Sequence, residues 1–144
     1  MNYKNILVAI DLTESSNIVI RKAISIARIS QAKVSFVFVD LLHGLNNTAL
    51  SYEEFQFTTS EPDLSSGKKH RQQLQDFADS ADYDIANCFY LTGNLSDQLQ
   101  EEVKELGADL LICGHHQHNF WTGFLSATPK IVNLSTTDLF IVQL

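Results

Sequence analysis

Residues capable of ligand chemistry stand directly after three short apolar runs. They are Asp11, Asp40 and Gly114. A carboxylate can orient a polar ligand, and a glycine lets a backbone approach one closely. Because the crevice of an open parallel α/β sheet lies beyond the carboxyl ends of its strands, these three positions mark a candidate site.

Three histidines, His115, His116 and His118, follow the last of these positions. Imidazole is a common metal ligand and a general base. However, adjacent loop side chains need not converge, and no nearby cysteine or carboxylate completes a closed set. No nucleophile with an orienting acid is evident either. We therefore expect no metal and no catalytic group, and we attribute the histidines to the architecture of their loop.

Five apolar runs of strand length alternate with segments of helical periodicity. A continuous apolar run is typical of a strand covered on both faces of a parallel sheet. We expect one domain over residues 1–144, an α/β fold with a doubly wound, five-stranded parallel sheet and helices on both faces, in a Rossmann-like arrangement. The runs are 6–10, 34–39, 85–91, 110–113 and 139–142.

Helix ends can also be predicted. Thr13 is expected to cap the first helix, with Glu14 in its first turn. Asn94 with Asp97 predicts the start of another helix, and Gly107 predicts its left-handed end.

The stretch 41–67 lacks periodicity and is too long for an ordinary loop, which is typical of functional or mobile segments. The basic residues 68–71 that follow are interpreted as a solvated face near a helix start.

Bulk composition excludes several classes of protein. The 144 residues are 44% hydrophobic and 19% charged, as expected of a globular domain. The formal net charge of -7 disfavours binding to nucleic acid. Cys88 and Cys113 lack metal-like spacing, and the first apolar run is too short for a membrane span. We expect a cytoplasmic protein with reduced thiols and no membrane partner.

Three stretches, "NILVAIDLTESS", "AKVSFVFVD" and "DLLICGHHQHNFW", resemble the universal stress protein family along nearly the whole chain. The resemblance implies an adenine-nucleotide alpha hydrolase-like fold and a cytoplasmic, homodimeric, noncatalytic stress-response protein with partner proteins that are unknown. The third stretch is more similar to the branch regarded as not binding ATP. Nearby Phe120 and Trp121 could meet a partner, although burial under a loop is the favoured interpretation.

In the nucleotide-binding branch, the turn after the fourth strand reads Gly-x-x-Gly, nine residues, then Gly with Ser or Thr. The same spacing here gives Gly114, Gln117, Ala127 and Thr128, so two of three glycines are missing. Pro129 also removes an amide that could face a phosphate. ATP is therefore disfavoured as a cofactor.

The resemblance also places Asp11 and Leu12 beside an adenosine, with the backbone of Val39 near the base. The alternative, which we favour, is that Asp11 organises the turn into the first helix through local hydrogen bonds. A nucleotide-binding switch or weak ATPase remains the alternative function. An adenylating enzyme is disfavoured, because the Ser-Gly-Gly loop of that group is replaced by Asp11-Leu12-Thr13.

The last apolar run, Leu139, Phe140, Ile141 and Val142, is expected to form an edge strand. Apolar edges are usually covered or paired. Members of the resembled family typically dimerise by pairing their last strands, so these four residues are the expected homodimer interface, with Phe140 in contact.

Overall fold

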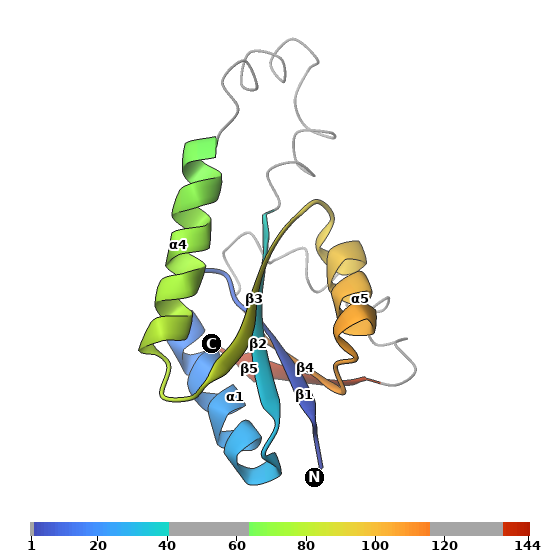
Figure 1. The fold of residues 1–144 in the computed structure, drawn as a ribbon. Coiled ribbons are helices and arrows are strands. Elements are labelled where there is room, and N and C mark those ends of the chain that lie inside the picture. The colour runs from blue at the N-terminus through green and yellow to red at the C-terminus, as the bar shows by residue number, and fades with distance from the viewer. Residues whose placement is uncertain (1, 41–63, 116–136) are drawn as a thin grey trace.

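A five-stranded parallel sheet forms the centre of the computed structural model, which describes residues 2–40, 64–115 and 137–144 (Figure 1). The strand order is β3-β2-β1-β4-β5, so the predicted doubly wound sheet is confirmed. The strands are β1 Asn5–Ala9, β2 Lys33–Asp40, β3 Ile85–Thr92, β4 Leu110–His115 and β5 Asp138–Gln143; the helices are α1 Ser16–Ser30, α4 Leu64–Ser80 and α5 Leu95–Leu106.

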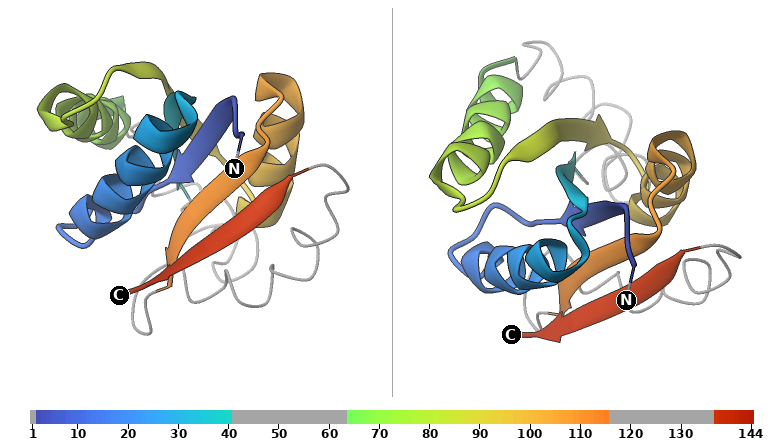
Figure 2. Two further views of the ribbon diagram at one scale, coloured as in Figure 1. Left: turned by 90° about the horizontal axis from the view of Figure 1, so that it is seen from below. Right: turned by 60° about the horizontal axis from the view of Figure 1, so that its bottom comes forward.

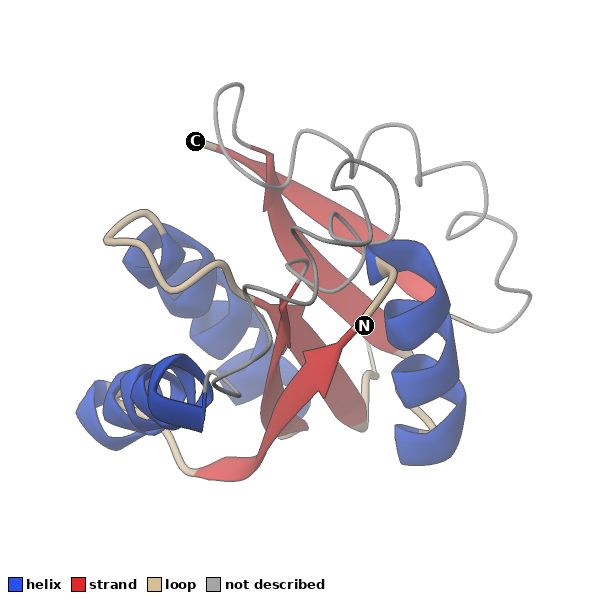
Figure 3. Cartoon of the chain, turned by 90° about the horizontal axis from the view of Figure 1, so that it is seen from above, coloured by secondary structure: helices blue, strands red, loops and turns tan. Residues whose placement is uncertain are grey.

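Helices cover both faces of this sheet, as Figures 2 and 3 show, with α1 and α4 on one face and α5 on the other. Side chains alternate between the faces along β1. Ile6 and Val8 pack in the cluster that contains α1 and α4 residues, whereas Leu7 and Ala9 pack with α5. The continuous apolar run of β1 therefore reflects burial on two sides.

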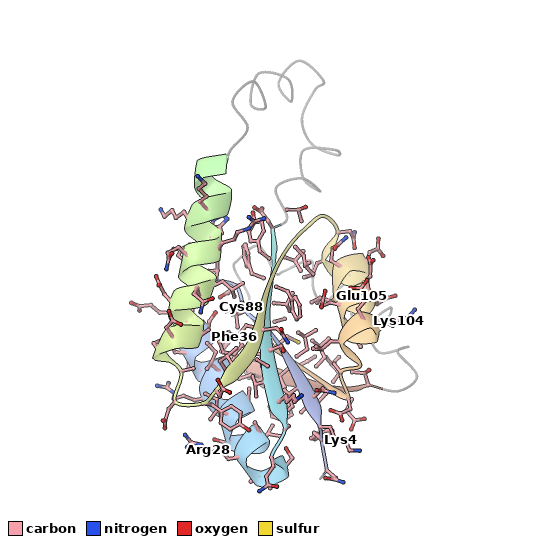
Figure 4. The ribbon with its side chains drawn as sticks, viewed as in Figure 1. Lys4, Arg28, Phe36, Cys88, Lys104 and Glu105 are labelled. Atoms are coloured by element: carbon pink, nitrogen blue, oxygen red, sulfur yellow. The ribbon has the colours of Figure 1, made fainter. Side chains whose placement is uncertain are left out.

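Phe36 is the largest fully buried side chain among the described residues and lies with the α1 and α4 cluster (Figure 4). Opposite, Lys104 and Glu105 lie on the outer side of α5 (Figure 4). The burial pattern thus matches the helical periodicity of the sequence.

The predicted ends of α5 are confirmed. The Asn94 side chain accepts a hydrogen bond of 3.1 Å from the backbone N–H of Asp97. At the other end, Gly107 has a φ of 66°, a left-handed conformation that a glycine adopts without a Cβ clash.

The predicted start of the first helix is wrong. Helix α1 begins at Ser16, its N-cap residue is Ser15, and no side chain caps it. Thr13 instead donates a hydrogen bond from its hydroxyl to Asp11. A helix cap would require the Thr13 hydroxyl oxygen to accept a bond from a helix N–H, whereas here the hydroxyl is a donor to the charged carboxylate of Asp11.

Helix α4 begins before the basic residues. Its first residue is Leu64, so residues 64–67 are helical and only 41–63 of the predicted irregular stretch lie outside the described residues. Lys68, Lys69 and Arg71 are exposed as expected for a solvated face. His70 is the exception, because it is half-buried toward the sheet and contacts Phe38.

Glu102 is a buried carboxylate on α5, with 7% of its surface exposed. Burial raises its pKa, and the nearby carboxylates of Glu105 and Glu101 raise it further. Because the pKa in the folded chain lies above that in the unfolded chain, the folded chain binds the proton more strongly. The free energy of unfolding therefore falls as pH rises through the raised pKa of Glu102 in the folded chain, and it remains reduced at neutral pH.

Replacing the charge should consequently stabilise the protein. We expect Glu102→Gln to raise Tm at pH 7 by about 2 °C, and the gain should shrink as the solution is acidified and the wild-type side chain takes up a proton. Thermal unfolding by circular dichroism measures both values. Glu101→Gln, at an exposed position, is the matched control and should change Tm less. A loss of stability in Glu102→Gln at pH 7 would contradict the assignment.

Candidate functional site

The candidate site lies at the carboxyl ends of β1 and β4. These two strands are neighbours in parallel register, with Ala9 opposite Cys113. The chain leaves β1 toward β2 on one side, while β4 and β5 lie on the other, so this is where the strand order reverses. Ligands of open α/β sheets bind at such a switch point.

The Asp11 carboxylate is held by hydrogen bonds from residues of the turn that follows it. Its Oδ1 accepts hydrogen bonds from the Thr13 backbone N–H at 3.0 Å, the Thr13 hydroxyl at 2.6 Å and the Ser16 hydroxyl at 2.8 Å. The Ser16 hydroxyl oxygen also accepts a bond of 3.3 Å from the Asp11 N–H. The interpretation that Asp11 organises this turn through local hydrogen bonds is confirmed.

Leu12 lies within this turn and has a φ of 65°, in the left-handed region that residues with a Cβ seldom adopt. Its half-buried side chain packs against the core cluster beneath α1 and α4. The Asp11 hydrogen bonds and this packing together offset a conformational cost of about 1 kcal/mol.

Gly114 does not face open space. A Cβ at this position would lie 2.7 Å from Cδ1 of Leu144 and 3.0 Å from Cγ2 of Val19. Leu144, directly after β5, thus occupies the room beside the glycine backbone where a ligand would approach. The glycine is required here because two apolar side chains of the same chain pack against it.

The described residues around Asp11 and Gly114 line a cavity of about 10 Å³, no more than one water molecule requires. A nucleotide needs at least a few hundred Å³. The cavity between Asp11 and Gly114, as the described residues line it, is therefore too small for a nucleotide. Its lining residues are Ala9, Ile10, Asp11, Ser16, Val19, Gly114 and Leu144.

Of the predicted nucleotide-site residues, the structure brings Asp11 and Gly114 together. Val39 lies in the adjacent β2, is 1% exposed and packs with the α5 cluster, so only its backbone could meet a ligand. Gln117, Ala127 and Thr128 lie outside the described residues, as do the side chains of His115, His116 and His118, together with Phe120, Trp121 and Pro129.

Among the lining residues that were not predicted as site residues from the sequence are Ser16 and Leu144. Ser16 could have been found from the hydroxyl residues two and five positions after Asp11, since both can reach one carboxylate. Leu144 carries no comparable signal, because its contact with Gly114 depends on the pairing of β5 with β4.

Neither thiol is activated. Cys113 is fully buried, and burial raises its pKa to about 12. Burial and the Asp79 carboxylate also raise the pKa of Cys88. Both stay protonated at neutral pH and are poor nucleophiles.

Over residues 2–40, 64–115 and 137–144, no three His, Cys, Asp or Glu side chains are placed to bind a metal ion. Nor do the described helices include one with the length and apolar character needed to cross a bilayer.

A larger hollow of about 530 Å³ lies between α1 and α4, away from the crevice. Ile20, Ile24 and Phe77 contribute apolar surface, and Arg28 donates a 2.6 Å bond to the Asp82 carboxylate at its rim. Because both partners are exposed, this ion pair adds little stability.

The four predicted interface residues on the edge strand β5 differ in how exposed they are. Phe140 is 40% exposed and Ile141 is 39% exposed. Leu139 is half-buried against the α5 cluster, and Val142, at 1% exposure, belongs to the core of this chain. Only Phe140 and Ile141 among these four thus present substantial apolar surface, whereas Val142 could contribute only its backbone.

The contact at Gly114 can be tested by a pair of substitutions. Gly114→Ala should lower the free energy of unfolding by about 1 kcal/mol or more, because the new Cβ crowds Leu144 and the stiff Val19 side chain. In the Leu144→Ala background, Gly114→Ala should lower the free energy of unfolding by a smaller amount, because the Leu144 side chain no longer crowds the new Cβ. Urea denaturation of the four proteins measures this coupling. Equal costs in both backgrounds would show that Leu144 does not pack on Gly114.

Comparisons of the sequence with known proteins indicate one protein family. Residues 2–143 match the model of the universal stress protein family. The chain is 33% identical to universal stress protein A of Photorhabdus laumondii, covering 100% of this chain and 97% of the relative. It is also 33% identical to universal stress protein A of Escherichia coli K12, covering 100% and 96%.

Solved structures extend this agreement to the fold. A crystal structure of a universal stress protein in complex with cAMP superposes with a TM-score of 0.68 at 22% identity, covering 99% of this chain and 98% of that one. Since the family model spans nearly the full sequence, the chain belongs to the universal stress protein family.

Proposed function

We propose that this chain is a cytoplasmic, noncatalytic stress-response protein that acts as a homodimer through contacts with partner proteins and does not bind ATP tightly. One observation supports the proposal above others. Among the described residues, Leu144 and Val19 pack on Gly114 and leave a cavity of only about 10 Å³ between Asp11 and Gly114.

The sequence supports the same proposal independently. Gln117 and Ala127 stand at glycine positions of the phosphate-binding pattern, and Pro129 lacks the amide that could face an anion. Phosphate binding at a helix start depends on free backbone N–H groups and on close approach of the backbone. Both features are impaired, so the free energy available from phosphate contacts is reduced.

A nucleotide-binding switch is the second candidate. It is supported by the solved relative that holds cAMP and by the meeting of Asp11 and Gly114 at the same crevice. In this alternative, Leu144 would have to move before a nucleotide could enter. Because Asp11 Oδ1 already accepts three hydrogen bonds, ligand binding would also have to preserve or replace them.

Calorimetric titration distinguishes these two functions. We expect Mg-ATP and cAMP to bind the wild-type chain with Kd above about 10 μM, which corresponds to less than about 7 kcal/mol. The variant Leu144→Ala, with a wider crevice, tests whether closure is the cause. A Kd below about 10 μM for the wild type would favour the switch.

The dimer is tested separately by light scattering at micromolar concentration. We expect twice the chain mass for the wild type, because pairing two β5 edges would satisfy their open backbone groups and cover Phe140 and Ile141. Phe140→Lys or Ile141→Lys should shift the mass toward the monomer. The matched control is Ile29→Lys, at a 74% exposed position on α1, which should leave the mass unchanged. A monomeric wild type would refute the dimer.

A further inference from the structure

The hollow between α1 and α4 is separate from the crevice at the carboxyl ends of the strands. Both helices cover the same face of the sheet (Figure 2), and no residue that lines the hollow also lines the cavity beside Gly114. Its volume is about 530 Å³. Sites for small organic molecules usually measure about 300–1,000 Å³. The hollow is therefore large enough to hold one such molecule.

Apolar side chains form the base of this hollow. Ile20 and Ile24 are four residues apart on α1, so they lie on one face of the helix, and both are buried. Phe77 on α4 is half-buried, as is Ala81 just beyond the end of that helix, and both pack against the same core cluster. An aromatic or aliphatic group that entered the hollow would pack beside the Phe77 ring and leave water.

Two arginines of α1, Arg21 and Arg28, also line the hollow. Arg28 donates hydrogen bonds to both the carboxylate and the backbone carbonyl of Asp82, so a partner within the hollow balances its charge. The Arg21 guanidinium, by contrast, has no hydrogen bond or ion pair within residues 2–40, 64–115 and 137–144. The described lining therefore carries one positive charge in excess, and Arg21 is available to an anion.

The charge of α1 contrasts with that of the whole chain. The formal net charge of the chain is -7, yet residues 16–30 contain Arg21, Lys22 and Arg28 and no acidic residue. A partner with many negative charges would be repelled by the rest of the surface. A single anionic group can instead pair with Arg21 at short range, where solvent and salt screen the attraction least. The charge distribution thus favours a small monoanion over an extended acidic segment.

We propose that this hollow binds a small amphipathic organic anion, in which one carboxylate or sulfonate group is joined to an aromatic or aliphatic body. Arg21 donates hydrogen bonds to the anionic group, because a planar guanidinium matches two oxygens of such a group. The body packs on Phe77 above Ile20 and Ile24. The pair of Arg28 with Asp82, at the C-terminal ends of both helices, bounds the site there.

Fluorescence titration with two related probes tests the proposal. Anilinonaphthalene sulfonate is an aromatic monoanion, and phenylnaphthylamine is its counterpart without the sulfonate. We expect one saturable site per chain for the anion, and Arg21→Gln should weaken that binding about fivefold or more, because a charge-assisted hydrogen bond is lost. Binding of the uncharged probe should not change. Absence of saturable binding, or an equal effect of Arg21→Gln on both probes, would overturn the proposal.

Lys22→Gln is the matched control. Lys22 is exposed on the same helix but does not line the hollow, so its replacement removes the same charge and should change the affinity for the anion by less than about twofold. An effect as large as that of Arg21→Gln would indicate general attraction of anions to α1 and would overturn the site. Arg21 is exposed, so Arg21→Gln should fold normally, which thermal unfolding verifies.

Two further measurements locate the bound probe. Ser25 is exposed and lines the hollow, so Ser25→Trp should fill part of the space and weaken the binding of both probes. In the wild type, nuclear Overhauser contacts should join the bound anion to the ring protons of Phe77. Contacts to Phe140 in place of Phe77 would put the probe on the β5 edge and refute the site, as would unchanged binding in Ser25→Trp.

Discussion

Burial of β1 on both faces is the constraint on which the rest of the structure depends. Ile6, Leu7 and Val8 are completely buried, and each contributes about 1.5–3 kcal/mol through removal of its side chain from water. Such a strand needs a neighbour on each edge and a layer on each face. The pairing with β2 and β4, and the placement of α1, α4 and α5, meet that requirement.

The same constraint determines where a site can form. The chain must leave β1 and turn sharply into α1, and Asp11 makes that turn by accepting three hydrogen bonds at one oxygen. Parallel pairing of β4 and β5 then brings Leu144 over Gly114. The strand arrangement of a ligand crevice is thus retained, while the space beside Gly114 is occupied by the side chains of Leu144 and Val19.

The positions of the strands and the ends of α5 can be predicted from the sequence, because they depend on the local pattern of residues. The apolar runs predict the strands, and Asn94 with Gly107 predicts the ends of α5. Prediction fails where tertiary contacts compete with local preference. Thr13 has the side chain of a helix cap but bonds Asp11, and His70 stands among solvated cations although it packs on Phe38. The Leu144 contact depends on strands separated along the chain, which no local pattern reveals.

Closure of the crevice is the central claim, and nuclear Overhauser contacts test it most directly. A methyl group of Leu144 should show a strong contact to the α protons of Gly114 in the free protein, because a Cβ at Gly114 would lie only 2.7 Å from Leu144 Cδ1. We expect the contact to persist in millimolar Mg-ATP. Its absence in the free protein, or its loss when nucleotide is added, would contradict a closed crevice.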